Sequence, residues 1–241
     1  RDKLVTGVQT CALPIFHVPH YNLPRRLSTP VVATIHDAIH LLFPEFLASG
    51  LHRVYARWRF ESGVARADRV IAVSETTRAD TERLVPRSAG KVGVVLSGVD
   101  AAFRPPESTA LADFRRRREL EKPYVLFVGL LRPHKNIARL VEAFERCAAA
   151  VPEPVRLVIR GTRDPRYAAI ERALDGGVAR GRVKVIPPID TEEMPLLYAG
   201  ARVLACPSLY EGFGLAVLEA MACGTPVLAG RAGSLPEVAG D

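Results

Sequence analysis

The sequence predicts an α/β protein with two parallel-sheet domains, and three patterns support that prediction. Short β-branched apolar runs alternate with helical patterns almost throughout the chain. These runs are continuously apolar, which is typical of strands buried on both faces of a parallel sheet. A glycine- and proline-rich break, SGVDAAFRPPE at 97–107, divides the alternation into two series. We therefore expect one sheet before the break and a second sheet after it.

The first series contains three predicted strands and two predicted helices. The segment FHVPHYNLP, which begins at Phe16, resembles a loop entering a domain. Ser74 is the expected N-cap of the second helix, and Thr77 is a further candidate. The strands are 31–35 (VVATI), 69–74 (RVIAVS) and 91–96 (KVGVVL), and the helices are 52–66 and 75–85.

The second series repeats the alternation with five predicted strands. Asn136 is a candidate cap for its first helix, Thr191 is the expected N-cap of the third, and Gly224 is expected to end the fourth. The strands are 124–129 (YVLFVG), 155–161 (VRLVIRG), 182–188 (RVKVIPP), 202–208 (RVLACPS) and 226–230 (PVLAG), and the helices are 136–150, 165–179, 191–201 and 215–224.

Length and composition narrow the class of protein. A chain of 241 residues with 48% hydrophobic and 24% charged content is ordinary for a soluble globular protein. It contains no apolar run long enough to span a bilayer and no signal segment at its start. None of its four cysteines forms a CxxC pair, which argues against a zinc site or a disulfide framework. We expect a cytoplasmic protein.

The formal net charge of +7 is concentrated in two basic clusters. One interpretation of each cluster is a solvated helix face. The other is adhesion to an anionic membrane surface, here the inner face of the membrane, or to acidic ligands. No recognition motif accompanies the charge, so nucleic acid is not an expected partner. The clusters are Arg115–Arg118, and Arg53, Arg57 and Arg59 interleaved with Tyr55, Trp58 and Phe60.

Ligands of open parallel sheets bind outside the carboxyl ends of the strands, so the loops that follow strands are the candidate sites. His36 and Asp37 directly follow the strand at 31–35. A histidine there can donate a hydrogen bond to a ligand or titrate near neutrality. The alternative is a structural histidine paired with a backbone group.

A second strand-end loop, VGLLRPHKN, carries Arg132 and Lys135 after Gly129. Two cations beside the start of a helix suit an anion, because backbone N–H groups and the helix dipole add to the side-chain charges. We therefore predict phosphate binding at this loop. The alternative is a pair of solvated surface cations.

The third loop, CPSLYEGFGLAVLEAM, places Glu211 before two glycines and a helix that carries Glu219. The glycines allow backbone N–H groups to approach a ligand closely. Glu219 lies about one and a half turns into the helix, where a carboxylate can take both hydroxyls of a ribose. The alternative for Glu219 is an exposed helical glutamate. The candidate backbone positions are Gly212, Phe213, Gly214 and Leu215.

A fourth strand-end loop, AGRAGSLPEVAG, offers further backbone donors near Gly233 and Ser234. Several motifs are missing from the sequence: it has no Asp-x-Asp, no GxxxxGK[ST], and no third glycine to complete a dinucleotide fingerprint. We therefore predict no metal site and no separate cofactor.

Together these segments resemble the retaining glycosyltransferases of family 4, also called glycosyl transferases group 1, and in particular their bacterial mannosyl or polysaccharide-type members. EGFGLAVLE matches the E-x7-E pattern of that family through Glu211 and Glu219. GSLPEVAGD and VGLLRPHKN resemble its C-terminal signature and phosphate loop, and TIHDAIHLLFPE, ADRVIAVSETT and SGVD resemble its N-terminal half. The resemblance covers about residues 17–241.

The resemblance implies a GT-B architecture, in which two Rossmann-like domains face a cleft. It also implies a role for each candidate residue. Arg132 and Lys135 hold the donor diphosphate, Glu219 holds the ribose, and Glu211 with the 212–215 backbone holds the donor sugar. His36 lines that sugar from the opposite domain. The four residues His36, Arg132, Lys135 and Glu211 are therefore our candidate catalytic set.

The implied reaction moves a mannose- or glucose-type hexose from a GDP- or UDP-linked donor to a glycan or lipid-linked acceptor, with retention and without metal. One alternative is a nucleotide-sugar-binding fragment without turnover. Another is a GT-B enzyme of a different class, such as a phosphorylase or an epimerase.

The resemblance also bears on the two ends of the chain. A widely used sequencing adapter can encode VTGVQTCALPI at 5–15, so we expect residues 1–15 to be foreign to the natural protein. We expect an incomplete N-terminal domain at 16–106 and a C-terminal nucleotide-sugar-binding domain at 107–241, truncated at its end.

Overall fold

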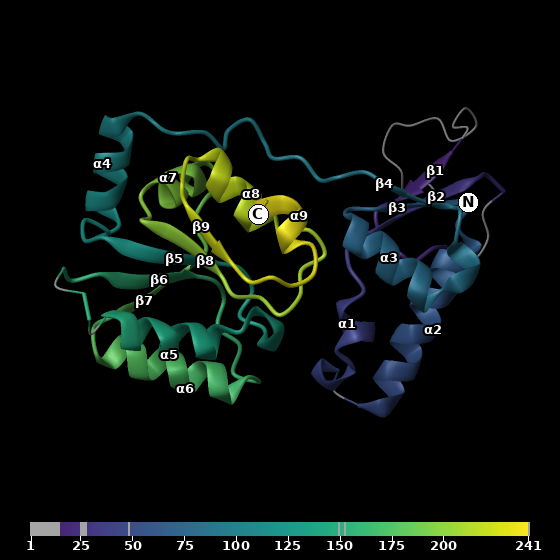
Figure 1. The fold of residues 1–241 in the computed structure, drawn as a ribbon, viewed down its shortest axis with the longest axis horizontal. Coiled ribbons are helices and arrows are strands. Elements are labelled where there is room, and N and C mark those ends of the chain that lie inside the picture. The colour runs from purple at the N-terminus through teal and green to yellow at the C-terminus, as the bar shows by residue number, and fades with distance from the viewer. Residues whose placement is uncertain (1–14, 25–27, 48, 149, 152, 241) are drawn as a thin grey trace. The chain divides into compact units, whose positions relative to one another are not determined.

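The computed structural model describes residues 15–24, 28–47, 49–148, 150–151 and 153–240, so the predicted foreign segment lies almost wholly outside the described residues. The chain forms two compact units, one ending at Leu96 and the other beginning at Ser97 (Figure 1). The predicted domain boundary after residue 106 lies further along the chain, just before helix α4 (Ser108–Arg117). Each unit has its own parallel sheet, which confirms the predicted fold class.

Among the described residues, the sheet of the first unit has four parallel strands in the order β1-β2-β3-β4. Its core combines apolar strand residues such as Ile35 and Val70 with Phe60 and Val64 of helix α2. The strands are β1 (Phe16–Val18), β2 (Val31–Ile35), β3 (Arg69–Ala72) and β4 (Val92–Val94). The helices are α1 (Ile39–Leu42), η2 (Pro44–Phe46), α2 (Gly50–Arg66), α3 (Glu75–Leu84) and η3 (Pro86–Ser88).

Two local expectations for this unit have definite outcomes. Ser74 is the N-cap of α3, and its hydroxyl accepts a hydrogen bond from the Thr77 amide at 3.0 Å, a type of contact worth about 1 kcal/mol. The expectation of a simple loop at Phe16 was wrong, because Phe16–Val18 pairs with β2 as a strand. The sequence shows no apolar run here, because the strand has only three residues and the middle one is the polar His17. The His17 ring forms a hydrogen bond with the Thr34 hydroxyl at 2.8 Å.

In the described part of the second unit, the sheet has five parallel strands in the order β7-β6-β5-β8-β9. The strands are β5 (Tyr124–Val128), β6 (Arg156–Arg160), β7 (Val183–Ile186), β8 (Val203–Cys206) and β9 (Val227–Ala229). The helices are α4 (Ser108–Arg117), η4 (Pro133–Lys135), α5 (Ile137–Ala148), α6 (Ala168–Ala179), η5 (Thr191–Glu193), α7 (Met194–Ala199), α8 (Leu215–Ala222) and α9 (Leu235–Ala239).

Helices cover both faces of this second sheet (Figure 1). Alternate strand residues point to opposite faces, so Leu157 and Ile159 of β6 pack in the cluster that includes α5 and α6. Val158 packs in the other cluster, which includes α7 and α8. The strands are therefore buried on both sides, as their continuous apolar sequences predicted.

Candidate functional site

The strand order places a candidate site at the carboxyl ends of β5 and β8. The chain proceeds from β5 through β6 to β7 on one side, and then returns to form β8 and β9 on the other. The connections after β5 and β8 thus leave neighbouring strands in opposite directions, and such a switch point is where open α/β sheets bind ligands. Two of the predicted loops begin there, the Arg132–Lys135 loop after β5 and the Glu211 loop after β8.

Two hydrogen bonds join these loops directly. The Leu209 amide donates to the His134 carbonyl at 2.7 Å. The Asn136 side chain donates to the Pro207 carbonyl at 3.3 Å. Asn136 directly precedes α5, and its carbonyl accepts the Leu140 amide at 3.1 Å, which is the cap position that the sequence predicted. Its backbone forms a left-handed turn after η4, with φ of 59°, and its side-chain amide joins the two loops.

Lys135 and Glu211 form the central pair of the site. The ammonium donates to Glu211 Oε1 at 2.5 Å, and the Ser208 hydroxyl donates to the same oxygen at 2.6 Å. The two side chains are only 19% and 15% exposed. Both bonds converge on Oε1, and among the described residues no hydrogen bond reaches Oε2. The arrangement leaves one carboxylate oxygen and two ammonium protons for a ligand.

Arg132 is anchored elsewhere in the same unit. Its guanidinium donates to the Tyr167 hydroxyl at 2.8 Å and lies 4.0 Å from the Asp164 carboxylate. Its side chain is 38% exposed, and among the described residues no hydrogen bond joins its guanidinium to the side chain of Lys135 or Glu211. The structure therefore brings Lys135 and Glu211 together, while the side chain of Arg132 is held by residues of the loop after β6.

The glycine-rich loop leads from Glu211 into α8. Gly214 has φ of 102° and is the N-cap of the helix, which has no side-chain cap. The first backbone N–H groups of α8 are thus not taken by a capping side chain, and they add partial positive charge beside the loop. Leu215, the first residue of the helix, is exposed, and Gly212 and Phe213 complete the loop.

The loop after β9 packs against the backbone of the Glu211 loop. The Ser234 hydroxyl donates to the Phe213 carbonyl at 2.7 Å and lies 3.1 Å from the Glu211 carbonyl. Gly233 has φ of 56°, and a Cβ on it would lie 2.5 Å from the Glu211 carbonyl oxygen. Only glycine allows this backbone approach, so the fourth predicted loop positions the third.

Glu219 lies in a protected environment on α8. Its Oε2 accepts a hydrogen bond from the Tyr198 hydroxyl at 2.6 Å, and Tyr198 itself is fully buried. Burial raises the pKa of the Glu219 carboxyl above its ordinary value, against the lowering effects of the Tyr198 bond and of the Arg160 charge. This environment excludes the alternative of a simply solvated glutamate.

Arg160, Tyr198, Ser208 and Tyr167 are site residues that the sequence reasoning missed. Arg160 ends β6 on the same sheet face as Val158, its carbonyl accepts the Gly129 amide at 3.1 Å, and its buried Nε has no partner among the described residues. Tyr198 and Tyr167 reach their partners across 21 and 35 residues of sequence, so no local motif marks them. Ser208 is three residues from Glu211 and could have been noticed in the CPS segment.

His36 belongs to the first unit and directly follows β2. It is exposed, and its ring Nε2 lies 3.2 Å from the Pro19 carbonyl oxygen. The neighbouring Asp37 carboxylate accepts the Ile39 amide at 3.0 Å. The strand-end position and the backbone partner agree with both interpretations given above, so the role of His36 stays a prediction.

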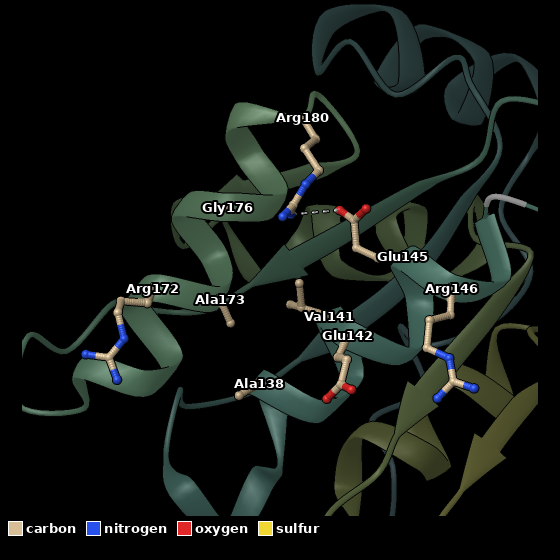
Figure 2. A pocket seen from close by; sticks show the side chains of 9 residues that line it. All are labelled: Ala138, Val141, Glu142, Glu145, Arg146, Arg172, Ala173, Gly176 and Arg180. Carbon is tan, nitrogen blue, oxygen red and sulfur yellow. Dashed lines mark ion pairs between the residues drawn. The ribbon is translucent and has the colours of Figure 1, made fainter.

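A separate pocket of about 500 Å³ lies between α5 and α6 (Figure 2). Arg180 Nη1 lies 3.8 Å from the Glu145 carboxylate in this pocket. None of the predicted site residues lines it, so it is distinct from the site at the strand ends.

The fold and the converging loops define a doubly wound α/β protein with its ligand site at a switch point. Comparison with known proteins then identifies the family. Residues 110–241 match the family profile described as "Glycosyl transferases group 1". Residues 9–103 match the family profile described as "Glycosyltransferase Family 4". The chain belongs to the group 1 glycosyl transferases, which confirms the resemblance seen in the sequence.

Several characterised proteins are similar over most of the chain. The O-antigen chain mannosyltransferase B of Escherichia coli is 30% identical over 94% of this chain and 59% of its own length. A D-inositol 3-phosphate glycosyltransferase of Xylanimonas cellulosilytica is 35% identical over 88% of this chain and 52% of its own length. The chain thus spans between half and three-fifths of these two relatives.

Solved structures show the same fold. Sucrose-phosphate synthase of Thermosynechococcus elongatus matches with a TM-score of 0.72 and 28% identity, over 92% of this chain and 57% of its own. HepE of Anabaena matches with a TM-score of 0.72 and 24% identity, over 87% of this chain and 55% of its own.

Proposed function

We propose that this chain is part of a retaining hexosyltransferase that uses a nucleotide-diphosphate sugar without a metal ion. The single observation that supports this most is the Lys135–Glu211 pair at the carboxyl ends of β5 and β8, beside the start of α8. A cation, a helix N-terminus and a carboxylate with one open oxygen match a ligand that joins a diphosphate to a sugar.

Three groups of the second unit bind the diphosphate. Lys135 donates to the diphosphate the ammonium protons that are not bound to Glu211. The first N–H groups of α8 add the partial positive charge of the helix N-terminus. Arg132 supplies a second cation from its position on Tyr167. When the bond between the anomeric carbon and the phosphate oxygen breaks, the electron pair stays on the diphosphate, and these groups stabilise the added charge.

Glu219 binds the ribose and Glu211 binds the donor sugar. Tyr198 occupies one oxygen of Glu219, which leaves the other to accept a ribose hydroxyl. The open Oε2 of Glu211 and the 212–215 backbone take hydroxyls of the sugar. The acceptor oxygen attacks the face from which the diphosphate leaves, and its proton passes to the departing phosphate oxygen, so configuration is retained.

The relatives guide the choice of substrates. The names of two relatives describe transfer of mannose to the O-antigen chain and glycosyl transfer to inositol 3-phosphate. We therefore propose a mannose- or glucose-type donor linked to GDP or UDP, and a glycan or lipid-linked acceptor. We also propose a cytoplasmic location, at the inner face of the membrane. Among the described residues, no helix is long and apolar enough to cross a bilayer.

The test is turnover with a panel of GDP- and UDP-sugars and glycan acceptors. Lys135→Ala and Glu211→Ala should each lower transfer by about 10²-fold or more, as does loss of one preorganised charge-stabilising group. Lys122→Ala, which removes an exposed lysine of the same unit, is the matched control and should leave transfer unchanged. Circular dichroism of each variant separates lost chemistry from lost folding.

Each outcome of this test decides between alternatives. If both site variants transfer sugar as well as the parent chain, the site assignment is wrong. If the parent chain binds nucleotide sugars and transfers nothing to any acceptor, the binding-fragment alternative replaces the transferase. Phosphate-dependent cleavage of a glycan would instead support the phosphorylase alternative.

A further inference from the structure

Arg160 of the second unit is a half-buried arginine without a partner. Its Nε is enclosed by protein, and among the described residues no hydrogen bond or ion pair reaches any nitrogen of the guanidinium. By contrast, Arg163 in the loop after β6 pairs with Glu171 at 2.9 Å. Arg166 in the same loop pairs with Asp164 at 2.7 Å. A guanidinium withdrawn from water without a carboxylate costs free energy, unless a bound ligand supplies the missing acceptors.

The fold places Arg160 at the carboxyl end of the sheet. It is the last residue of β6, it lies opposite Val128 of β5, and its carbonyl accepts the Gly129 amide at 3.1 Å. Gly161, the next residue, has no room for a Cβ, because that atom would overlap the Gly129 carbonyl oxygen. The backbone beside Arg160 is therefore held against the start of the loop that carries Lys135.

The side chain of Arg160 belongs to the face of the sheet that α7 and α8 cover. It shares this face with Val158, because alternate residues of a strand point the same way. Burial raises the pKa of the Glu219 carboxyl, and the Arg160 charge is one of the influences that oppose this rise. Among the described residues no ion pair joins Arg160 to Glu219. The guanidinium is thus near the proposed ribose site, while its donors stay open.

The order of the strands matches the order of the groups in a nucleotide sugar. The strands β8, β5 and β6 are neighbours in the sheet, about 4.8 Å apart, and their carboxyl ends lead to Glu211, Lys135 and Arg160 in that order. The proposed site takes the sugar at Glu211 and the diphosphate at Lys135, so the nucleoside comes next, beside β6. With the ribose at Glu219, the base is the part of the donor that remains for Arg160.

The shape of a guanidinium selects among bases. Its parallel N–H groups bind best to two neighbouring acceptors. Guanine presents such a pair in O6 and N7, and arginine binds it with two hydrogen bonds. Uracil presents O4 beside the N3–H donor, so an arginine makes one bond there and faces a second donor. Guanine therefore fits this position better than uracil does.

We propose that Arg160 binds the base of the donor nucleotide, with its two terminal nitrogens donating to O6 and N7 of guanine, and that it makes the chain select GDP-linked over UDP-linked sugars. This inference rests on the proposed function, because it takes Lys135 to hold the diphosphate and Glu219 to hold the ribose. It names the residue that sets the choice between the two nucleotides which that function left open.

The test measures the affinity of the chain for three diphosphates by isothermal titration. They are GDP, UDP and 7-deaza-GDP, in which a C–H group replaces N7 and removes one acceptor. We expect GDP to bind about tenfold or more tightly than UDP, and more tightly than 7-deaza-GDP by a similar factor. Because these measurements use the parent chain, they decide the question even where a variant fails to fold.

A matched pair of variants assigns the effect to Arg160. Arg160→Met removes the guanidinium and keeps an unbranched apolar stem. It should weaken GDP binding by about tenfold or more, leave UDP binding almost unchanged, and abolish the difference between GDP and 7-deaza-GDP. Arg156→Met is the control, because Arg156 lies on the same face of β6 at the amino end of the strand. It should leave all three affinities unchanged. Circular dichroism checks the folding of both variants.

The remaining outcomes overturn the inference. If the parent chain binds UDP or 7-deaza-GDP as tightly as GDP, the guanine edge is not recognised. If Arg160→Met weakens GDP and UDP equally, Arg160 acts on the phosphates or through Glu219. In both cases a nucleoside diphosphate still binds, so the transferase proposal stands. If neither GDP nor UDP binds, the proposed function fails, and this inference fails with it.

Discussion

At the scale of single residues, the site depends on two carboxylates, each with one oxygen bound by neighbouring side chains and the other oxygen available to a ligand. Glu211 receives the hydrogen bonds of Lys135, Ser208 and the Cys206 thiol on one oxygen, and Glu219 receives one from Tyr198. Each carboxylate is thus fixed in orientation while keeping an acceptor for a ligand hydroxyl. Such preorganisation lowers the cost of ordering side chains when a ligand binds.

Glu219 gives a prediction about stability and pH. Because burial raises its pKa above the ordinary 4.5, the folded protein binds its proton more tightly than the unfolded chain does. Ionisation of Glu219 therefore destabilises the fold, an effect that is absent well below pH 4.5 and complete once the pH exceeds the raised pKa. We expect Glu219→Gln to melt at a higher temperature than the parent chain at pH 7.

The same melting experiment at pH 4 provides the control, since the stabilising effect of Glu219→Gln should shrink there. Glu237→Gln serves as the matched variant, because Glu237 is an exposed glutamate of helix α9. A Glu219→Gln protein that is less stable than the parent at pH 7 would show that the Tyr198 bond to the carboxylate outweighs its burial.

At the scale of elements, the packing of one strand-end loop on another sets the position of Glu211. Gly233 allows the loop after β9 to approach the Glu211 backbone, as the 2.5 Å distance for an added Cβ shows. Gly233→Ala should therefore displace the Glu211 loop and weaken donor binding by roughly 10- to 100-fold, the scale expected for misplacement of about 1 Å. Isothermal titration with UDP- and GDP-sugars measures the change.

Gly181 provides a matched control for this variant. It has φ of 69°, close to the 56° of Gly233, but no atom lies within 4 Å of an added Cβ. Gly181→Ala thus introduces similar backbone strain without a clash at the site. If the two variants bind donor equally well, the contact between the two loops does not position Glu211.

The elements also show what sequence patterns can predict. Strand 31–35 and the Ser74 cap were found because their signals are local: an apolar run, and a serine before a helix. The short β1 was missed because pairing with β2, not its own composition, makes it a strand. The bond from the Asn136 side chain to the Pro207 carbonyl was missed, because the two residues are 71 positions apart in the sequence.

At the scale of the whole molecule, two series of strands became two separate sheets, as the glycine- and proline-rich break predicted. The order β7-β6-β5-β8-β9 was not predictable from alternation alone, because local pattern does not state which strands are neighbours. Yet that order is what brings Lys135 and Glu211 together. The candidate residues could be chosen from sequence, while their pairing required the fold.

The central claim is that the switch point of the second unit binds the diphosphate of a nucleotide sugar through Lys135. The most direct measurement compares the affinity of the chain for UDP with that for uridine, and for GDP with that for guanosine, by isothermal titration. We predict that at least one diphosphate binds about tenfold or more tightly than its nucleoside, and that Lys135→Ala removes most of this difference while Lys122→Ala preserves it. Equal affinity for nucleoside and diphosphate, or a difference that survives in Lys135→Ala, would contradict the claim.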